Sequence, residues 1–220
     1  MSDAQRLFDE MKVEMLPLED RIRSHPFISA VESGSVPRER FRLFAGEQYH
    51  IIESDLRSVA HLLSRHSASP AHDFFWGILQ GEKAAFERLV RFGAAVGMDL
   101  EALSAHEPDP RAHAYTAYMA WLAAYGWAGQ VAAAFALNFS AWGDNCARMS
   151  AGLKDRYGFS EEDVGFFDLF ATPPPDLENR AVEIVGHDLG RGLSPRLIKR
   201  AARLLQGYEL MYWDAMSTPI

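Results

Sequence analysis

Five hydrophilic side chains stand on helix faces where the sequence pattern calls for hydrophobic residues. Gln48 and Asp55 fall on the apolar stripe of one predicted helix, and Glu82, Asn138 and Glu209 fall on the stripes of three others. A polar group buried without a partner is costly, so these groups must face other polar groups or a wet pocket. We favour the pocket. A carboxyl group held there could serve as a general acid or base.

Aromatic side chains accompany these polar residues. Trp142 follows Asn138 by four residues and therefore shares its helix face. Tyr212 lies on the same stripe as Glu209, and Tyr115 lies on a preceding helix. Aromatic walls with a few polar groups are typical of sites for planar small molecules.

The longest apolar helix face that contains polar residues belongs to a helix predicted over residues 37–66. Its apolar residues recur at the i, i+3, i+4, i+7 spacing of an amphipathic helix: Phe41, Phe44, Ile51, Ile52, Val59, Leu62 and Leu63. Gln48 and Asp55 occupy positions of this repeat where a leucine would be expected.

Helical spacing recurs along the whole chain, and no segment shows the alternation of a strand. Further helices are predicted over residues 3–24, 26–32, 71–96, 111–125, 128–157, about 160–170, a stretch that follows 176 and ends near 190, and 194–216, with 98–105 a short helix or loop. No linker or repeat divides these segments. We therefore predict one all-α helical bundle as a single domain over residues 1–220.

Composition excludes several classes of function. The net charge of -8 argues against a nucleic-acid-binding protein, which would carry a basic stripe. The single cysteine, Cys146, suits a reducing compartment, and residues 1–12 lack the apolar core of a signal peptide, so we expect a cytoplasmic protein. Residues 112–143 contain no charged side chain but carry polar residues and glycines, which favours buried helices over a membrane span.

Metal and cofactor motifs are not evident. The eight histidines lack the spacing of a metal site, and neither His-Glu-x-x-His nor paired cysteines occur. The glycine-containing segment 186–192 ends a helix and follows no strand, so it does not predict a phosphate loop. We expect neither a metal nor a cofactor.

Several short segments resemble the TenA and PqqC proteins of the haem-oxygenase-like fold. These are His25-Pro26-Phe27 with the aromatic helix 41–52, the segment Tyr115-Thr116-Ala117-Tyr118-Met119, and Glu209-Leu210-Met211-Tyr212-Trp213-Asp214. Their order and spacing agree over nearly the whole chain. The resemblance implies a single helical bundle with a central pocket, and it implies a homo-oligomer.

The resemblance also implies an activity. TenA proteins are typically aminopyrimidine hydrolases of thiamin salvage, with a nucleophilic Cys, an Asp on the long helix and a Glu on the last helix. Glu209 matches that Glu, and Tyr115 and Tyr212 match pocket aromatics. Gln48 stands in place of the Asp and Asn138 in place of the Cys. An amide is not a nucleophile at neutral pH, so the family's usual covalent step has no group to perform it.

We therefore predict an enzyme that binds a small planar heteroaromatic molecule related to thiamin, with Glu209 as acid or base. The predicted ligand contacts are Gln48, Tyr115, Asn138, Trp142, Tyr212, Asp55 and Glu82. Two alternatives remain open. One is a PqqC-like cofactorless oxidase of a heterocycle, which the segment from Tyr157-Gly158-Phe159 to Phe166-Phe167 resembles more closely. The other is a non-catalytic protein that binds a small molecule.

Overall fold

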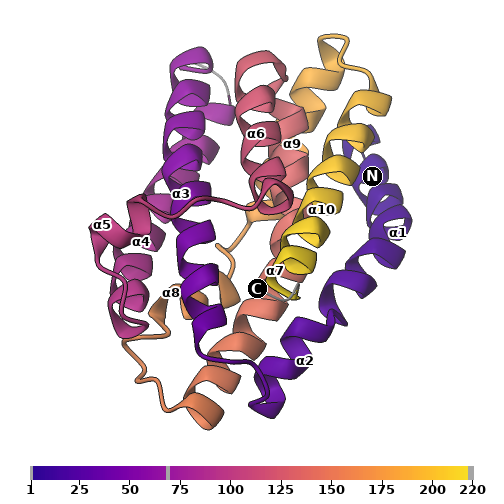
Figure 1. The fold of residues 1–220 in the computed structure, drawn as a ribbon. Helices are drawn as coiled ribbons and strands as arrows, with labels where there is room; N and C mark the ends of the chain where they lie inside the picture. Colours follow the sequence, from indigo (N-terminus) through magenta and orange to yellow (C-terminus); the bar gives the residue numbers. More distant parts are fainter. Residues whose placement is uncertain (1, 68–69, 218–220) are drawn as a thin grey trace.

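The computed structural model describes residues 2–67 and 70–217, and over these residues the chain forms helices and no strand (Figure 1). The all-α prediction is therefore confirmed. The helices in chain order are α1 (Asp3–Arg23), α2 (Pro26–Ser33), α3 (Glu39–Arg65), α4 (Ala71–Ala95), α5 (Leu100–Ser104), α6 (Pro110–Tyr125), α7 (Ala128–Tyr157), α8 (Gly165–Ala171), α9 (Leu177–Gly190) and α10 (Pro195–Ser217).

Two predicted helix starts were wrong. α3 begins at Glu39, two residues after Pro37. α8 begins at Gly165 rather than near Ser160, because the preceding residues close a turn through their side chains. The Ser160 backbone N–H and hydroxyl both donate to the Asp163 carboxylate, and the Asp163 N–H donates to the Ser160 hydroxyl. Such side-chain bonds compete with helical backbone bonds.

The helices pack around α7, which contacts α1, α2, α8, α9 and α10. α3 packs between α4 and α6, and α10 joins the two groups by packing on both α6 and α7 (Figure 1). The buried side chains form two hydrophobic clusters, one containing Phe44 and Trp213 and the other containing Phe75 and Phe135. The fold therefore has a core in two parts, and the polar residues singled out above lie where these parts meet.

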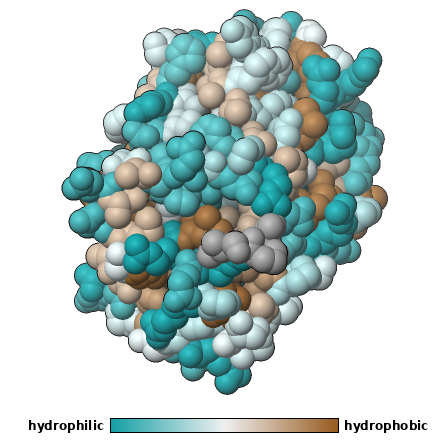
Figure 2. All heavy atoms as spheres, in the orientation of Figure 1, coloured by the Kyte–Doolittle hydropathy of each residue, from teal (hydrophilic) through white to brown (hydrophobic). Residues whose placement is uncertain are grey.

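The uncharged segment 112–143 lies within α6 and α7, and most of the α7 residues in it are buried against other helices. Among the residues that the structure describes, no helix is long and apolar enough to cross a membrane. The face of the molecule in Figure 2 is largely hydrophilic, with small hydrophobic areas between polar side chains.

Close packing of α7 against α8 gives a stability prediction. A Cβ atom on Gly143 would lie 2.8 Å from the carbonyl oxygen of Phe170, a backbone atom that cannot move aside alone. Gly81 in α4 is exposed and has no neighbour within 4 Å of its added Cβ. We expect Gly81→Ala to stabilise the protein by about 0.5–1 kcal/mol through helix propensity, and Gly143→Ala to destabilise it by about 1–3 kcal/mol.

Urea unfolding of the two alanine variants and the wild type measures both effects. The helix-propensity gain applies at both positions, so the difference between the variants reports the contact with Phe170 alone. Equal and positive shifts for both variants would show that α7 and α8 do not approach this closely.

Candidate functional site

A cavity lies at the junction of the two hydrophobic clusters, with about 530 Å³ of atom-free space when the part open to solvent is included. Six helices supply its lining, which consists of Gln48, Ile51, Ile52 and Asp55 of α3, Glu82 of α4, Tyr115 of α6, Phe135, Asn138, Phe139 and Trp142 of α7, Phe170 of α8, and Glu209 and Tyr212 of α10. The wall is mainly apolar and aromatic, with acids and amides at intervals.

The structure brings all eight residues selected from the sequence to this cavity. They come from five helices and from positions as far apart as Gln48 and Tyr212. Helical periodicity had placed all of them except Tyr115 on an inward face. The five polar ones are buried, with no more than 6% of their surface exposed.

Glu209 is the most fully engaged of these polar groups. Its Oε2 atom accepts a hydrogen bond of 2.5 Å from Nδ2 of Asn138, and its Oε1 atom accepts one of 3.1 Å from the indole N–H of Trp213. Both donors are neutral, so they do not compensate the loss of water around an ionised carboxylate. Burial raises the pKa of Glu209 from 4.5 to about 8, although the two hydrogen bonds oppose this rise. The side chain is therefore a carboxylic acid at neutral pH.

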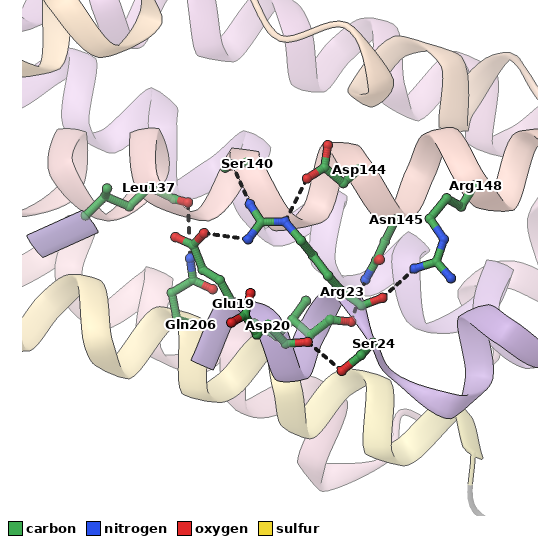
Figure 3. Close-up of polar contacts among 11 residues, drawn as sticks. Glu19, Asp20, Arg23, Ser24, Leu137, Ser140, Asp144, Asn145, Arg148 and Gln206 are labelled. Atoms are coloured by element: carbon green, nitrogen blue, oxygen red, sulfur yellow. Dashed lines mark hydrogen bonds and ion pairs between the residues drawn. The ribbon is translucent and has the colours of Figure 1, made fainter. Parts of the chain in front are cut away.

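The register between α7 and α10 holds this contact in place. Gln206, one turn before Glu209, donates from Nε2 to the carbonyl oxygen of Leu137 at 3.1 Å (Figure 3). Leu137 directly precedes Asn138, so two consecutive links join the helices at this level. Gln206 is fully buried, so its bond to Leu137 favours this register of the two helices.

A network of charged side chains joins α1 to α7 near Glu209. Arg23 of α1 reaches α7, where it donates to Asp144 at 2.7 Å and to Ser140 at 2.8 Å, and it also donates to Glu19 at 2.9 Å (Figure 3). Arg148 donates to the Arg23 backbone carbonyl and to Glu32. Glu19 raises the pKa of Glu209 and Arg23 lowers it, so the two charges act on Glu209 in opposite directions.

Aromatic rings form one side of the cavity. The ring of Trp142 lies edge-on to those of Tyr212 and Phe170, with centroids 5.9 Å away in each case, and it is tilted against Trp213 at 5.3 Å. Burial raises the pKa of Tyr212 well above its usual value, and the nearby Gln48 amide opposes this rise. The phenol thus stays protonated and can donate a hydrogen bond.

A second acidic group lies on the α3–α4 side of the cavity. Asp55 and Glu82 are 3% and 6% exposed. Burial raises the pKa of Asp55 well above its usual value, and the neighbouring Glu82 raises it further. Burial also raises the pKa of Glu82, from 4.5 to about 7. Two neighbouring buried carboxyl groups cannot both ionise cheaply, so the pair tends to retain a proton.

The position that the resemblance assigns to a cysteine nucleophile is occupied by Asn138, which is bonded to Glu209. Cys146 lies two turns further along α7, is fully buried, and is not part of the cavity wall. Burial raises the pKa of its thiol well above the usual value, which keeps it protonated. Cys146 therefore does not replace the missing nucleophile.

Glu47 and His50 stand three residues apart on α3, which is the Glu-x-x-His spacing of metal-binding bundles, so the prediction that the histidines lack the spacing of a metal site was wrong. The structure engages both with the loop before α6. Oε1 of Glu47 accepts from the Asp109 N–H at 2.8 Å and from His106 at 3.0 Å, and Nε2 of His50 lies 2.6 Å from the His106 carbonyl oxygen. Within the part of the chain that the structure describes, no group of three or more His, Cys, Asp or Glu side chains is arranged to hold a metal.

Two features of the site went unrecognised in the sequence. Trp213, the second donor to Glu209, lies four residues after it on α10, a spacing that could have revealed the pair. Phe170 comes from the short helix α8, whose seven residues are too few for periodicity to show which face is buried.

The family model described as TENA/THI-4/PQQC family matches residues 13–218, nearly the whole chain. No curated protein matches the sequence closely enough to count as a relative.

Several solved structures have the same arrangement of helices but share little sequence identity with this chain. A TenA homologue from Pseudomonas syringae pv. tomato has a TM-score of 0.79 at 16% identity, covering 94% of this chain and 91% of that one. A putative TenA-like thiaminase from Sulfolobus solfataricus has a TM-score of 0.67 at 16% identity, with 98% and 96% covered.

A third structure, described as a domain of unknown function with a haem-oxygenase-like fold, comes from Shewanella denitrificans. Its TM-score is 0.74 at 16% identity, with 98% of this chain and 92% of that chain covered. At these identities the likeness concerns the fold alone, and the haem-oxygenase-like fold expected from the sequence is confirmed.

Proposed function

The chain belongs to the TENA/THI-4/PQQC family, and we propose that it binds a small planar heteroaromatic molecule of the aminopyrimidine type and hydrolyses it. The observation that carries this proposal is the buried, protonated Glu209, held between Asn138 and Trp213 on the wall of an aromatic cavity. A neutral carboxylic acid can donate to a ring nitrogen and accept from an exocyclic amino group at the same edge.

The chemistry assigned to Glu209 is general acid catalysis of C–N cleavage. Glu209 donates its proton to the pyrimidine as the exocyclic C–N bond breaks and the bonding electrons leave with the amine nitrogen. Water adds to the carbon and gives one proton to the amine, the protonated ring returns its proton to Glu209, and the products are an alcohol and an amine. Positioned acid groups typically contribute about 10²–10⁴-fold to a rate. Water takes the role of nucleophile because Asn138 cannot.

Binding and turnover test the proposal together. Thiamin and 4-amino-2-methylpyrimidine derivatives are titrated against the protein while tryptophan fluorescence is followed, and products are identified by mass spectrometry. Because Trp142 lines the cavity and Trp76 is half exposed on α4, Trp142→Phe should remove most of the ligand-dependent change and Trp76→Phe should retain it. No binding and no product across the panel would contradict the proposal.

A non-catalytic binding protein is the second candidate, and a specific observation favours it. The amide of Asn138 occupies the position where the resemblance places a nucleophile, and the thiol of Cys146 is buried away from the cavity. This candidate predicts saturable binding without any product. The PqqC-like oxidase has less support, since the residues that line the cavity include no His, Arg or Lys.

We also propose that the protein is a cytoplasmic homo-oligomer. Support for self-association comes from α6, where Trp121 and Tyr125 are 44% and 73% exposed and the Trp121 ring stacks on that of Tyr118. Exposed clusters of large aromatic residues commonly mark protein interfaces. Light scattering of the purified protein measures its oligomeric state, and a monomer at all concentrations would contradict this part.

A further inference from the structure

The Asp55–Glu82 pair is left without a role by the chemistry assigned to Glu209. Both side chains line the cavity, and no cationic side chain lowers the pKa of either one. The Oδ1 atom of Asp55 is buried and accepts no hydrogen bond from the protein. An acceptor in this state is rare in a folded interior and calls for a partner from outside the chain.

Sharing a proton between the two acids does not fully satisfy them. One proton supplies one hydrogen bond, whereas two carboxyl groups offer four oxygen atoms. A metal ion fits poorly as well, because the described residues supply no third carboxylate, His or Cys to complete a coordination shell around the pair. A protonated amine fits better, since it carries one positive charge and three donors in a compact group.

The cavity has two polar ends, separated along α3. Gln48 lies beside Tyr212 at the Glu209 end, and Asp55 follows Gln48 by two helical turns. At about 1.5 Å per residue, these seven positions span about 10 Å. Tyr115 of α6 also lines the cavity, and besides burial the acids of both ends, Asp55, Glu82 and Glu209, raise the pKa of its phenol. Its ring can also contact a cation that approaches the pair.

We propose that Asp55 and Glu82 form a subsite for a positively charged nitrogen, and that the ligand is a planar ring with a short chain that ends in an amine. This inference rests on the proposed function for the placement of the ring at Glu209. A six-membered ring with a substituent of about three atoms spans the distance estimated above. The ammonium group would donate to the unpartnered oxygen of Asp55 and to Glu82.

Two pairs of probes, each differing only in charge, test the subsite by calorimetry at pH 7. The first pair is 4-aminopyrimidine with a 3-aminopropyl or a 3-hydroxypropyl group at carbon 5. The second pair, 3-phenylpropylamine and 3-phenylpropanol, lacks the pyrimidine. We expect each amine to bind the wild type about tenfold more tightly than its alcohol, as is typical when a charge-assisted hydrogen bond replaces a neutral one.

Variants at Asp55 and Glu82 test whether these two residues cause the preference for the amine. Asp55→Asn and Glu82→Gln keep the size of each side chain and prevent it from ionising, and both should reduce the preference for the amine to about threefold or less. Glu87→Gln is the matched control, because Glu87 is an exposed acid on the same helix as Glu82. It should leave the preference unchanged.

The outcomes separate this inference from the proposed function. Pyrimidine binding without preference for the amine would overturn the subsite and leave the proposed function standing. A preference confined to the phenylpropyl pair, and dependent on Asp55, would support the subsite and contradict aminopyrimidine recognition. Absence of any amine preference in the wild type, or a preference that both variants retain, would overturn the subsite, as would failure of all four probes to bind.

Discussion

Glu209→Gln should lower kcat for aminopyrimidine hydrolysis by about 10²–10⁴-fold while ligand affinity changes little. The amide keeps the volume of the side chain, and its oxygen can still accept from Trp213 while Asn138 turns its own amide to accept the new N–H. What is lost is the proton that the carboxylic acid donates as the C–N bond breaks. The glutamine variant removes only that step.

The pH profile gives a second measure of the same group. Since burial raises the pKa of Glu209 to about 8, its acid form predominates below that pH and disappears above it. We expect kcat to fall tenfold for each pH unit above about 8 in the wild type, and the residual rate of Glu209→Gln to lack this decline. Steady-state kinetics with product quantification from pH 6 to 10 measures both quantities. A glutamine variant as active as the wild type would refute acid catalysis by Glu209, whereas binding without wild-type turnover would favour the non-catalytic candidate.

The protein should lose stability as the pH rises from about 5 to 8, and Glu82→Gln should remove a large part of this loss. In the unfolded chain Glu82 and Glu209 return to pKa values near 4.5, whereas in the folded state burial raises them to about 7 and about 8. Between these values the folded state binds more protons than the unfolded state. The free energy of unfolding therefore falls with rising pH across this window.

The size of the effect follows from the pKa values. One pKa unit corresponds to about 1.4 kcal/mol, so the rise from 4.5 to about 7 at Glu82 is worth about 3 kcal/mol once the group is ionised. Asp55 and Glu82 titrate together, so this free energy belongs to the pair. Carboxyl groups with lowered pKa values, such as Glu32 and Asp163, make the free energy of unfolding rise with pH instead, but they do so below about pH 4.5.

Urea unfolding at pH 5, 6, 7 and 8 checks the prediction. Glu82→Gln should match the wild type to within about 1 kcal/mol at pH 5 and exceed it by about 2–3 kcal/mol at pH 8. Glu87→Gln, on the exposed face of the same helix, should follow the wild type at every pH. Parallel curves for Glu82→Gln and the wild type would show that Glu82 is not held in its acid form by the fold.

Stability and binding are thus opposed in this cavity. Near pH 8 the buried carboxyl groups of Asp55, Glu82 and Glu209 make the bundle less stable than an apolar core would. Such a loss of stability is common at functional sites. The same arrangement supplies a proton donor at one end of the cavity and, by the inference above, a site for an ammonium group at the other.

The inward direction of the site residues was determined by the sequence alone. Helical periodicity is a local property of the backbone, so residues spaced three or four apart must share a face wherever the helix packs. This placed Gln48, Asp55, Glu82, Asn138 and Glu209 on buried faces, and the fold class followed from the same pattern. Periodicity did not separate Cys146 from Asn138, because eight residues keep a helix face but move a side chain about 12 Å along it.

Only the tertiary structure decided which inward groups meet. The contact between Asn138 and Glu209 depends on the register of α7 against α10, and the proximity of Asp55 to Glu82 depends on the register of α3 against α4. These registers result from packing and from bonds such as Gln206 to Leu137, whose partners are distant in the chain. The raised pKa values have the same origin, because desolvation depends on how many helices surround a carboxyl group, and no single helix encodes that number.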